Sequence, residues 1–140
     1  MSVQAADFPT LSTTGTSRKA LLTGRVLSGL AVLFLLFDAI GKLLQPAAAV
    51  EGTTQLGWSA DVLVPLGIIQ FVCLFLYLLP RTSFLGAVLW TGYLGGAIAT
   101  HVRVDNPLFS HVLFPVYVAA LLWGGLWLRD RRVRALLPFA

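Results

Sequence analysis

The apolar residues of this chain gather in four long blocks that more polar connections separate. The blocks cover about residues 21–44, 62–79, 83–101 and 107–128. Each block is long enough for an α-helix, which rises about 1.5 Å per residue, to cross about 30 Å of hydrocarbon. The pattern therefore predicts an all-α fold, a polytopic membrane protein built as a bundle of four transmembrane helices.

Capping and turn residues mark the ends of these blocks. Pro80 follows the second block, and Thr82 and Ser83 are good N-cap residues for the third. Asn106 and Pro107 open the fourth block with a polar cap and a proline in the first turn. These residues mark the end of the second block and the starts of the third and fourth.

The first residues of the chain differ from the rest. Residues 1–17 are rich in Ser and Thr and lack periodicity, which predicts a disordered tail before a single domain over residues 18–140. The run PAAAVEG after the first block imitates a signal-peptide cleavage site. However, the block before it is too long for a signal-peptide core and contains Asp38 and Lys42, so we interpret it as a retained membrane span.

Composition strengthens the membrane assignment. Hydrophobic residues make up 57% of the chain and charged residues only 11%, whereas soluble domains carry about a quarter charged residues. The net charge of +4 comes from basic residues at the ends of apolar blocks, which indicates contact with anionic lipid and not with nucleic acid. The single cysteine, Cys73, excludes a dithiol relay and a disulfide within the chain.

The basic residues also predict an orientation, because they concentrate on the cytoplasmic side of membrane proteins. Two of them, Lys42 and Arg103, fall on one side of the predicted bundle. The other eight fall on the opposite side: Arg18, Lys19, Arg25, Arg81, Arg129, Arg131, Arg132 and Arg134. We therefore expect both termini in the cytoplasm of a bacterial cell, with the protein in the inner membrane and the connections 45–61 and 102–106 facing outward. The arginine-rich run RDRRVR is expected to anchor the chain to anionic lipid at the inner face.

Polar residues within the blocks converge on one depth. Measured along the helices from the basic ends, Asp38 lies about 20 Å up, Tyr93 about 18 Å and Gln70 about 16 Å, near mid-membrane. His101 and His111 lie about 30 Å and 27 Å up, close to the outer interface. The residues that fall in the outer half are Asp38, Lys42, Tyr93, His101, Arg103 and His111, and this set is the predicted ligand-binding site.

Each member of this set has a simpler structural interpretation as well. Asp38 and Lys42 are spaced four residues apart on one helix face, so they are either an ion pair that orients the helix or a pair that handles a proton or a ligand. His101 and His111 offer two ligands at one depth for a metal or haem. Two histidines without a spacing signature favour interfacial or hydrogen-bonding roles over a metal or haem site.

Small residues predict close helix packing in the third block. Gly92 and Gly96 form a small-xxx-small pair, and Gly95 lies beside them. Such residues let a neighbouring helix approach closely, because its side chains fill the missing volume. We therefore expect Gly92, Gly95 and Gly96 to form a helix-packing surface.

Several long stretches resemble one family of proteins. The matching stretches are FDAIGKLLQP, LYLLPRTSFLGAVLWTGYLGGAIATHVRVDNPLFSHVLFPVY and WGGLWLRDRRVRALLP. They resemble the DoxX-like family of small four-helix membrane proteins of bacteria, over roughly residues 24–138. The resemblance implies the four-helix fold and a place near membrane redox or oxidative-stress systems, with more distant relatives that are similar to chaperones or cargo receptors. It supplies no catalytic residues.

These observations lead to three functional hypotheses. The first is an accessory component of a membrane redox or stress-response system that binds a small amphipathic ligand, a quinone or a lipid, in an outward-facing pocket between the first, third and fourth spans. The second is a non-catalytic assembly or chaperone-type protein that packs against a protein partner or another copy of itself. The third is a small-molecule transporter, although transporters of the small-multidrug type carry their acidic residue deeper than Asp38. The sequence holds no recognisable nucleophile–base motif, which disfavours an enzyme, and quinone is preferred to haem as a cofactor.

Overall fold

The computed structural model describes residues 15–138, and every regular element in that range is helical. In chain order these are α1 (Arg18–Leu44), α2 (Ala47–Gln55), η1 (Ala60–Val62), α3 (Leu63–Leu78), α4 (Ser83–Arg103), η2 (Leu108–Val112), α5 (Phe114–Arg129) and α6 (Arg131–Leu136). Residues 1–14, most of the tail predicted to be disordered, lie outside the described residues.

Four helical segments of the described chain are long and apolar enough to cross a membrane, as the sequence predicted. They are Arg18–Leu44, Ala60–Leu78, Ser83–Arg103 and Leu108–Arg129. The first span begins three residues before its apolar block because the Ser17 hydroxyl accepts a hydrogen bond from the Ala20 amide at 3.2 Å, which satisfies a free amide of the first turn. The all-α fold class and the membrane assignment are confirmed.

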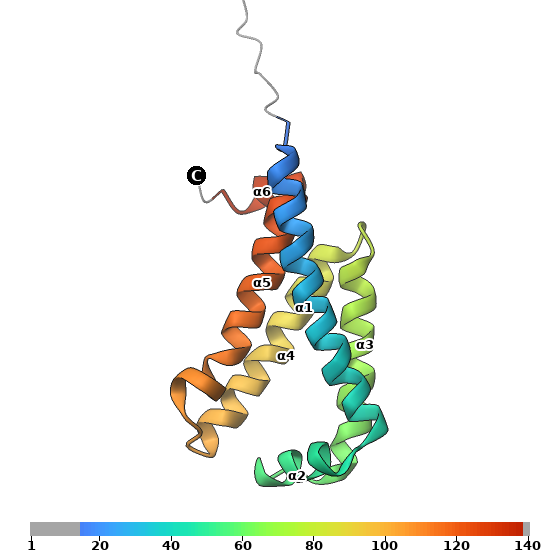
Figure 1. Ribbon diagram of the computed structural model, residues 1–140, viewed down its shortest axis with the longest axis vertical. Helices are drawn as coiled ribbons and strands as arrows, with labels where there is room; N and C mark the ends of the chain where they lie inside the picture. Colours follow the sequence, from blue (N-terminus) through green and yellow to red (C-terminus); the bar gives the residue numbers. More distant parts are fainter. Residues whose placement is uncertain (1–14, 139–140) are drawn as a thin grey trace, which may run out of the picture.

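The four spans pack in a closed cycle. Helix α1 contacts α3 and α5, and α4 contacts the same two helices. Figure 1 shows the start of α1 and all of α6 at one end of the bundle, which we call the terminal end. The short helix α2 and the α4–α5 connection lie at the opposite end, which we call the α2 end (Figure 1).

A close helix contact lies in the terminal half, between α1 and α5. A Cβ atom added at Gly24 would lie 2.8 Å from the Gly125 carbonyl oxygen and 2.9 Å from the Leu128 Cβ. Glycine is therefore required on both helices for their backbones to meet. Nearby, the buried Tyr77 hydroxyl donates to the Leu122 carbonyl at 2.7 Å and lies 2.9 Å from the Ser28 hydroxyl, which links α1, α3 and α5.

The glycines predicted to pack closely, Gly92, Gly95 and Gly96, are not the ones that do so within this chain. No described heavy atom outside their own helix and neighbours lies within 4 Å of a Cβ added at any of the three. They lie on the outward face of α4, where no other helix of the described residues covers them. Packing of this face against a partner stays a prediction.

The buried core is concentrated away from the α2 end. Trp90 is fully buried, and Leu94 is the last buried residue of α4, which continues to Arg103. Figure 1 shows α1 and α3 separating from α4 and α5 toward the α2 end. The inward faces of the helices in that half are consequently less covered than those in the terminal half.

Candidate ligand-binding site

Three polar side chains meet where the helices separate. The Lys42 ammonium group donates to the Asp38 carboxylate within α1, and the two form an ion pair. The Gln70 amide of α3 donates to the same carboxylate oxygen of Asp38 at 2.6 Å. The structure thus confirms the contact between Asp38 and Lys42 and adds a third partner from another span.

Asp38 lies on the face of α1 that packs against the bundle. Leu35 and Ala39, next to it on that face, are buried, yet the Asp38 side chain is 39% exposed and that of Lys42 19% exposed. An ionised carboxylate within a membrane span is expensive unless water, a partner or a ligand reaches it. The exposure of an inward-facing carboxylate therefore indicates accessible space beside it, in the half of the bundle nearer the α2 end.

Gln70 is the residue of this site that the sequence-based set left out. Its side chain is completely buried, and its Oε1 atom has no hydrogen-bond partner among the described residues. The opposite amide orientation would place Oε1 against the Asp38 carboxylate, so the observed orientation is the favourable one. The sequence did indicate its position, because the depth of Gln70 along its helix is within about 4 Å of the depth predicted for Asp38.

Tyr93 contributes an aromatic ring to the same level of α4. It is half-buried, and its ring packs edge-to-face on Trp90 with centroids 5.4 Å apart. The hydrogen bonds of the described chain do not include one from its hydroxyl group to Asp38. Tyr93 therefore joins the wall of the core beside the site, and a direct role in binding stays a prediction.

The two histidines meet at the α2 end. The rings of His101 in α4 and His111 in η2 are 5.7 Å apart and edge-to-face. Their Nδ1 atoms lie 2.8 Å from the Asn106 amide nitrogen and the Ser110 hydroxyl, respectively. Over residues 15–138, no group of three or more His, Cys, Asp or Glu side chains is close enough to hold a metal. The segment that carries His111 is a π-helix, a rare form that frequently marks functional sites.

Arg103 connects α4 to the loop after α2. Its guanidinium group donates to the Leu56 carbonyl oxygen at 2.5 Å and stacks on the Trp58 ring, 5.4 Å from the centroid. Both partners precede η1, so this contact joins the two parts of the bundle that separate at this end. Arg103 is therefore a structural contact in this arrangement, and its predicted part in ligand binding stays a prediction.

The predicted residues thus form three groups. Asp38 and Lys42, with Gln70, form the deepest group, and the histidine pair and Arg103 lie nearer the α2 end. Hydrogen bonds among the described residues do not join one group to another. The outward-facing pocket predicted between α1, α4 and α5 stays a prediction, and the partly exposed Asp38 carboxylate lies on α1 against Gln70 of α3.

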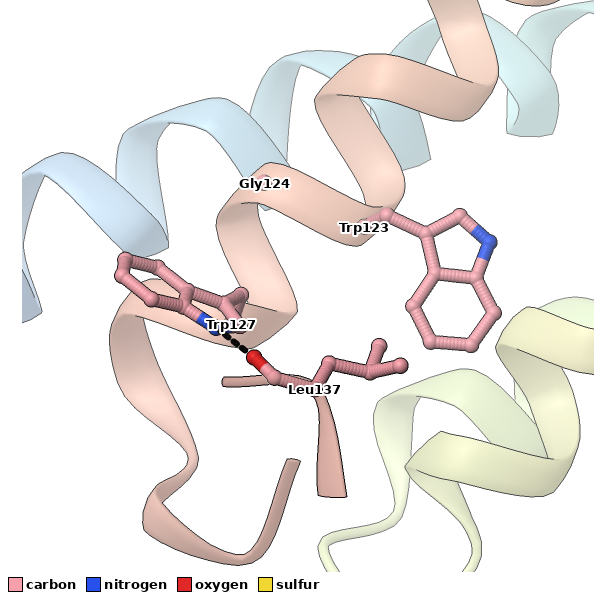
Figure 2. Close-up of a pocket in the computed structure, with 4 residues that line it drawn as sticks. All are labelled: Trp123, Gly124, Trp127 and Leu137. Atoms are coloured by element: carbon pink, nitrogen blue, oxygen red, sulfur yellow. Dashed lines mark hydrogen bonds between the residues drawn. The ribbon is translucent and has the colours of Figure 1, made fainter. Parts of the chain in front are cut away.

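Two pockets lie at the terminal end. One, of about 310 Å³, is apolar and lined by Trp123, Gly124, Trp127 and Leu137. Figure 2 shows the two indoles of α5 flanking Leu137, whose carbonyl oxygen accepts a hydrogen bond from Trp127 at 2.9 Å. Tryptophan is enriched at membrane interfaces, which fits this position at the end of a span. The other pocket is polar and is described below.

Comparison with known proteins identifies one family. The DoxX-like family matches residues 26–125, a segment that includes Asp38, Lys42, Gln70 and the whole of α4. Neither a curated protein nor a solved structure matches the chain significantly. The match covers most of the chain and all four spans in whole or in large part. The chain is therefore a multi-pass membrane protein of the DoxX-like family.

Proposed function

We propose that this protein is an accessory component of a membrane redox or stress-response system, which binds the polar head of a quinone or lipid beside Asp38. The terminal end faces the cytoplasm of a bacterial cell and the α2 end faces outward, in line with the eight basic residues near the terminal end. The single observation that carries the proposal is the partly exposed Asp38 carboxylate on the inward face of α1.

The chemistry of this group suits an amphipathic ligand. Lys42 supplies a donor for a carbonyl oxygen, Asp38 supplies an acceptor for a hydroxyl group, and Gln70 holds the Asp38 carboxylate in place. A quinone presents carbonyl groups when oxidised and hydroxyl groups when reduced, so Lys42 and Asp38 offer partners to both forms. An apolar tail is accommodated by the lipid-facing side chains that cover the outer surface of the spans.

The test is the ligand content of the purified protein and of two variants. We expect the native protein to retain about one quinone or lipid per chain, detected by mass spectrometry and by an absorbance spectrum. Asp38→Asn removes the charge that Lys42 and Gln70 contact, and retention should fall about tenfold or more, since a charge-assisted hydrogen bond contributes about 1.5–3 kcal/mol.

Asp61→Asn is the matched control, because Asp61 is an exposed carboxylate at the start of the second span. It should retain the ligand as the native protein does. Equal retention by Asp38→Asn and the native protein would reject the proposal, and a Soret band would replace quinone with haem as the cofactor.

A second function, as an assembly or interaction protein, is favoured by the open face of α4. Gly92, Gly95 and Gly96 leave room for a partner helix that this chain does not supply. In that case Gly96→Leu should abolish co-purification of the partner, while Asp38→Asn has little effect. Gly29→Leu is the control, because Gly29 also has open space beside it but lies on α1.

A further inference from the structure

A polar pocket of about 310 Å³ lies at the terminal end, where α1, the α3–α4 connection, α5 and α6 meet. Its size is at the lower limit of small-ligand pockets, which span about 300–1,000 Å³. Most of its charge is positive. The polar side chains that line it are Arg25, Ser83, Arg129, Asp130, Arg131 and Arg132.

Arg129 carries the strongest indication of a missing partner. Its Nε and Nη2 atoms are buried and make no hydrogen bond within the described part of the chain. The guanidinium group stacks on the Tyr77 ring, 5.1 Å from the centroid, and Tyr77 is itself held by its hydrogen bond to the Leu122 carbonyl. A buried cationic donor without an acceptor is unfavourable, so this position favours an anion.

The one acidic residue of the pocket does not supply that anion. Asp130 caps α6 by accepting from the Arg132 amide at 2.9 Å, and its carboxylate also pairs with the Arg132 guanidinium. Burial raises the pKa of Asp130, but the hydrogen bonds and charge of Arg132 outweigh this effect and hold the pKa below its ordinary value. Across residues 15–138, neither Arg25, Arg129 nor Arg131 forms a salt bridge.

We propose that this pocket binds one phosphate group, supplied by the head group of an anionic phospholipid at the membrane face. Arginine is suited to this task because its planar fork of donors matches phosphate oxygens. Arg129 ends the fourth span, so the pocket lies where lipid phosphates are found. The phosphate accepts from the Arg129 guanidinium group, and Arg25 and Arg131 add positive charge from α1 and α6.

This proposal differs from general attraction of a basic tail to anionic lipid. A general attraction depends on the number of charges, whereas a pocket depends on which arginine is changed. Arg81 provides the comparison, since it is exposed, belongs to the α3–α4 connection and does not line the pocket. Arg129→Gln and Arg81→Gln therefore remove the same charge from the same end of the molecule.

The experiment measures binding of three probes to the purified full chain in a neutral detergent: phosphatidylglycerol, phosphatidylcholine and inorganic phosphate. Native mass spectrometry counts the bound lipid, and a thermal unfolding series gives its affinity. We expect one phosphatidylglycerol to bind preferentially to the native protein, with affinity about tenfold or more weaker in Arg129→Gln and unchanged in Arg81→Gln. Arg25→Gln, on the other side of the pocket, repeats the test if Arg129→Gln does not fold.

The outcomes separate the sources of the phosphate. Stabilisation by inorganic phosphate that Arg129→Gln abolishes supports the phosphate site and assigns a soluble phosphate as its occupant. Equal losses in Arg129→Gln and Arg81→Gln would overturn the proposal in favour of a diffuse basic surface. Failure of all three probes to bind the native protein selectively would overturn it as well, independently of what happens at Asp38.

Discussion

Gly24 and Gly125 decide how closely α1 and α5 approach. The two glycines face each other, and any side chain at either position meets the backbone of the opposite helix. Helices in lipid gain little from apolar burial, so packing contacts of this kind carry much of their association. A single residue at the right position in the terminal half therefore determines the geometry of two spans.

We expect Gly24→Ala to lower the stability of the bundle by about 1–3 kcal/mol, the usual penalty of overpacking. The added Cβ would lie 2.8 Å from the Gly125 carbonyl oxygen, and backbone cannot move aside easily. Thermal or denaturant unfolding in detergent measures the effect. Gly92→Ala is the control: its Cβ meets open space, and alanine favours the helix by about 1 kcal/mol, so stability should stay equal or rise. Equal losses in both variants would contradict the assigned contact.

At the scale of elements, α4 has two distinct halves. One face of its first half packs against α3 and α5 and carries all the buried residues of the helix, from Ser83 to Leu94. Its second half has no buried residue and ends in Arg103, whose guanidinium group holds the loop that follows α2. Helix α2 itself has no buried residue, so the Arg103 contact is an important restraint on its position.

We predict that Arg103→Gln loosens α2 and the loop after it. The variant loses both the hydrogen bond to the Leu56 carbonyl and the stacking on Trp58. Amide hydrogen exchange in α2 and over residues 56–58 should become faster, while exchange in α3 stays unchanged. Arg81→Gln serves as the control with the same loss of charge, and unchanged exchange in Arg103→Gln would contradict the predicted restraint.

The long apolar blocks were sufficient to predict the four spans, because a run of that length has few alternatives to a membrane helix. Helix α2 was not predicted, since its nine residues are short and without a clear apolar face. Depth along each helix placed Asp38, His101 and His111 near their observed neighbours. It does not give the rotation of each helix about its own axis, which decides the direction in which a side chain points. For that reason the contact of Gln70 with Asp38 and the outward position of Gly96 were accessible only from the structure.

At the scale of the whole molecule, the bundle is tight at the terminal end and open at the α2 end. The main cluster of buried hydrophobic residues, the facing glycines and the Tyr77 hydrogen bonds all lie toward the tight end or the middle. The polar residues Asp38, His101 and His111 lie where the helices separate. The two proposed sites, one for an amphipathic ligand and one for phosphate, therefore lie in opposite halves of the bundle.

The orientation of this asymmetric bundle is testable with single cysteines. We expect Ser59→Cys, near η1, to react with a membrane-impermeant maleimide in intact cells. Ala135→Cys, in α6, should react only after the membrane is permeabilised, because the terminal end is proposed to face the cytoplasm. Cys73 is buried and should contribute little background. The reverse pattern of labelling would invert the proposed topology.

The exposed position of Trp58, the residue on which Arg103 stacks, has a spectroscopic consequence. Trp58 lies in the loop before η1 and is 46% exposed, whereas Trp90 is fully buried and Trp123 and Trp127 line the apolar pocket at the terminal end. An ionic quencher confined to the water on the α2 side should therefore reduce the emission of Trp58 selectively. The protein thus carries an intrinsic fluorophore beside its open end, and occupancy of that end can be followed without attaching a dye.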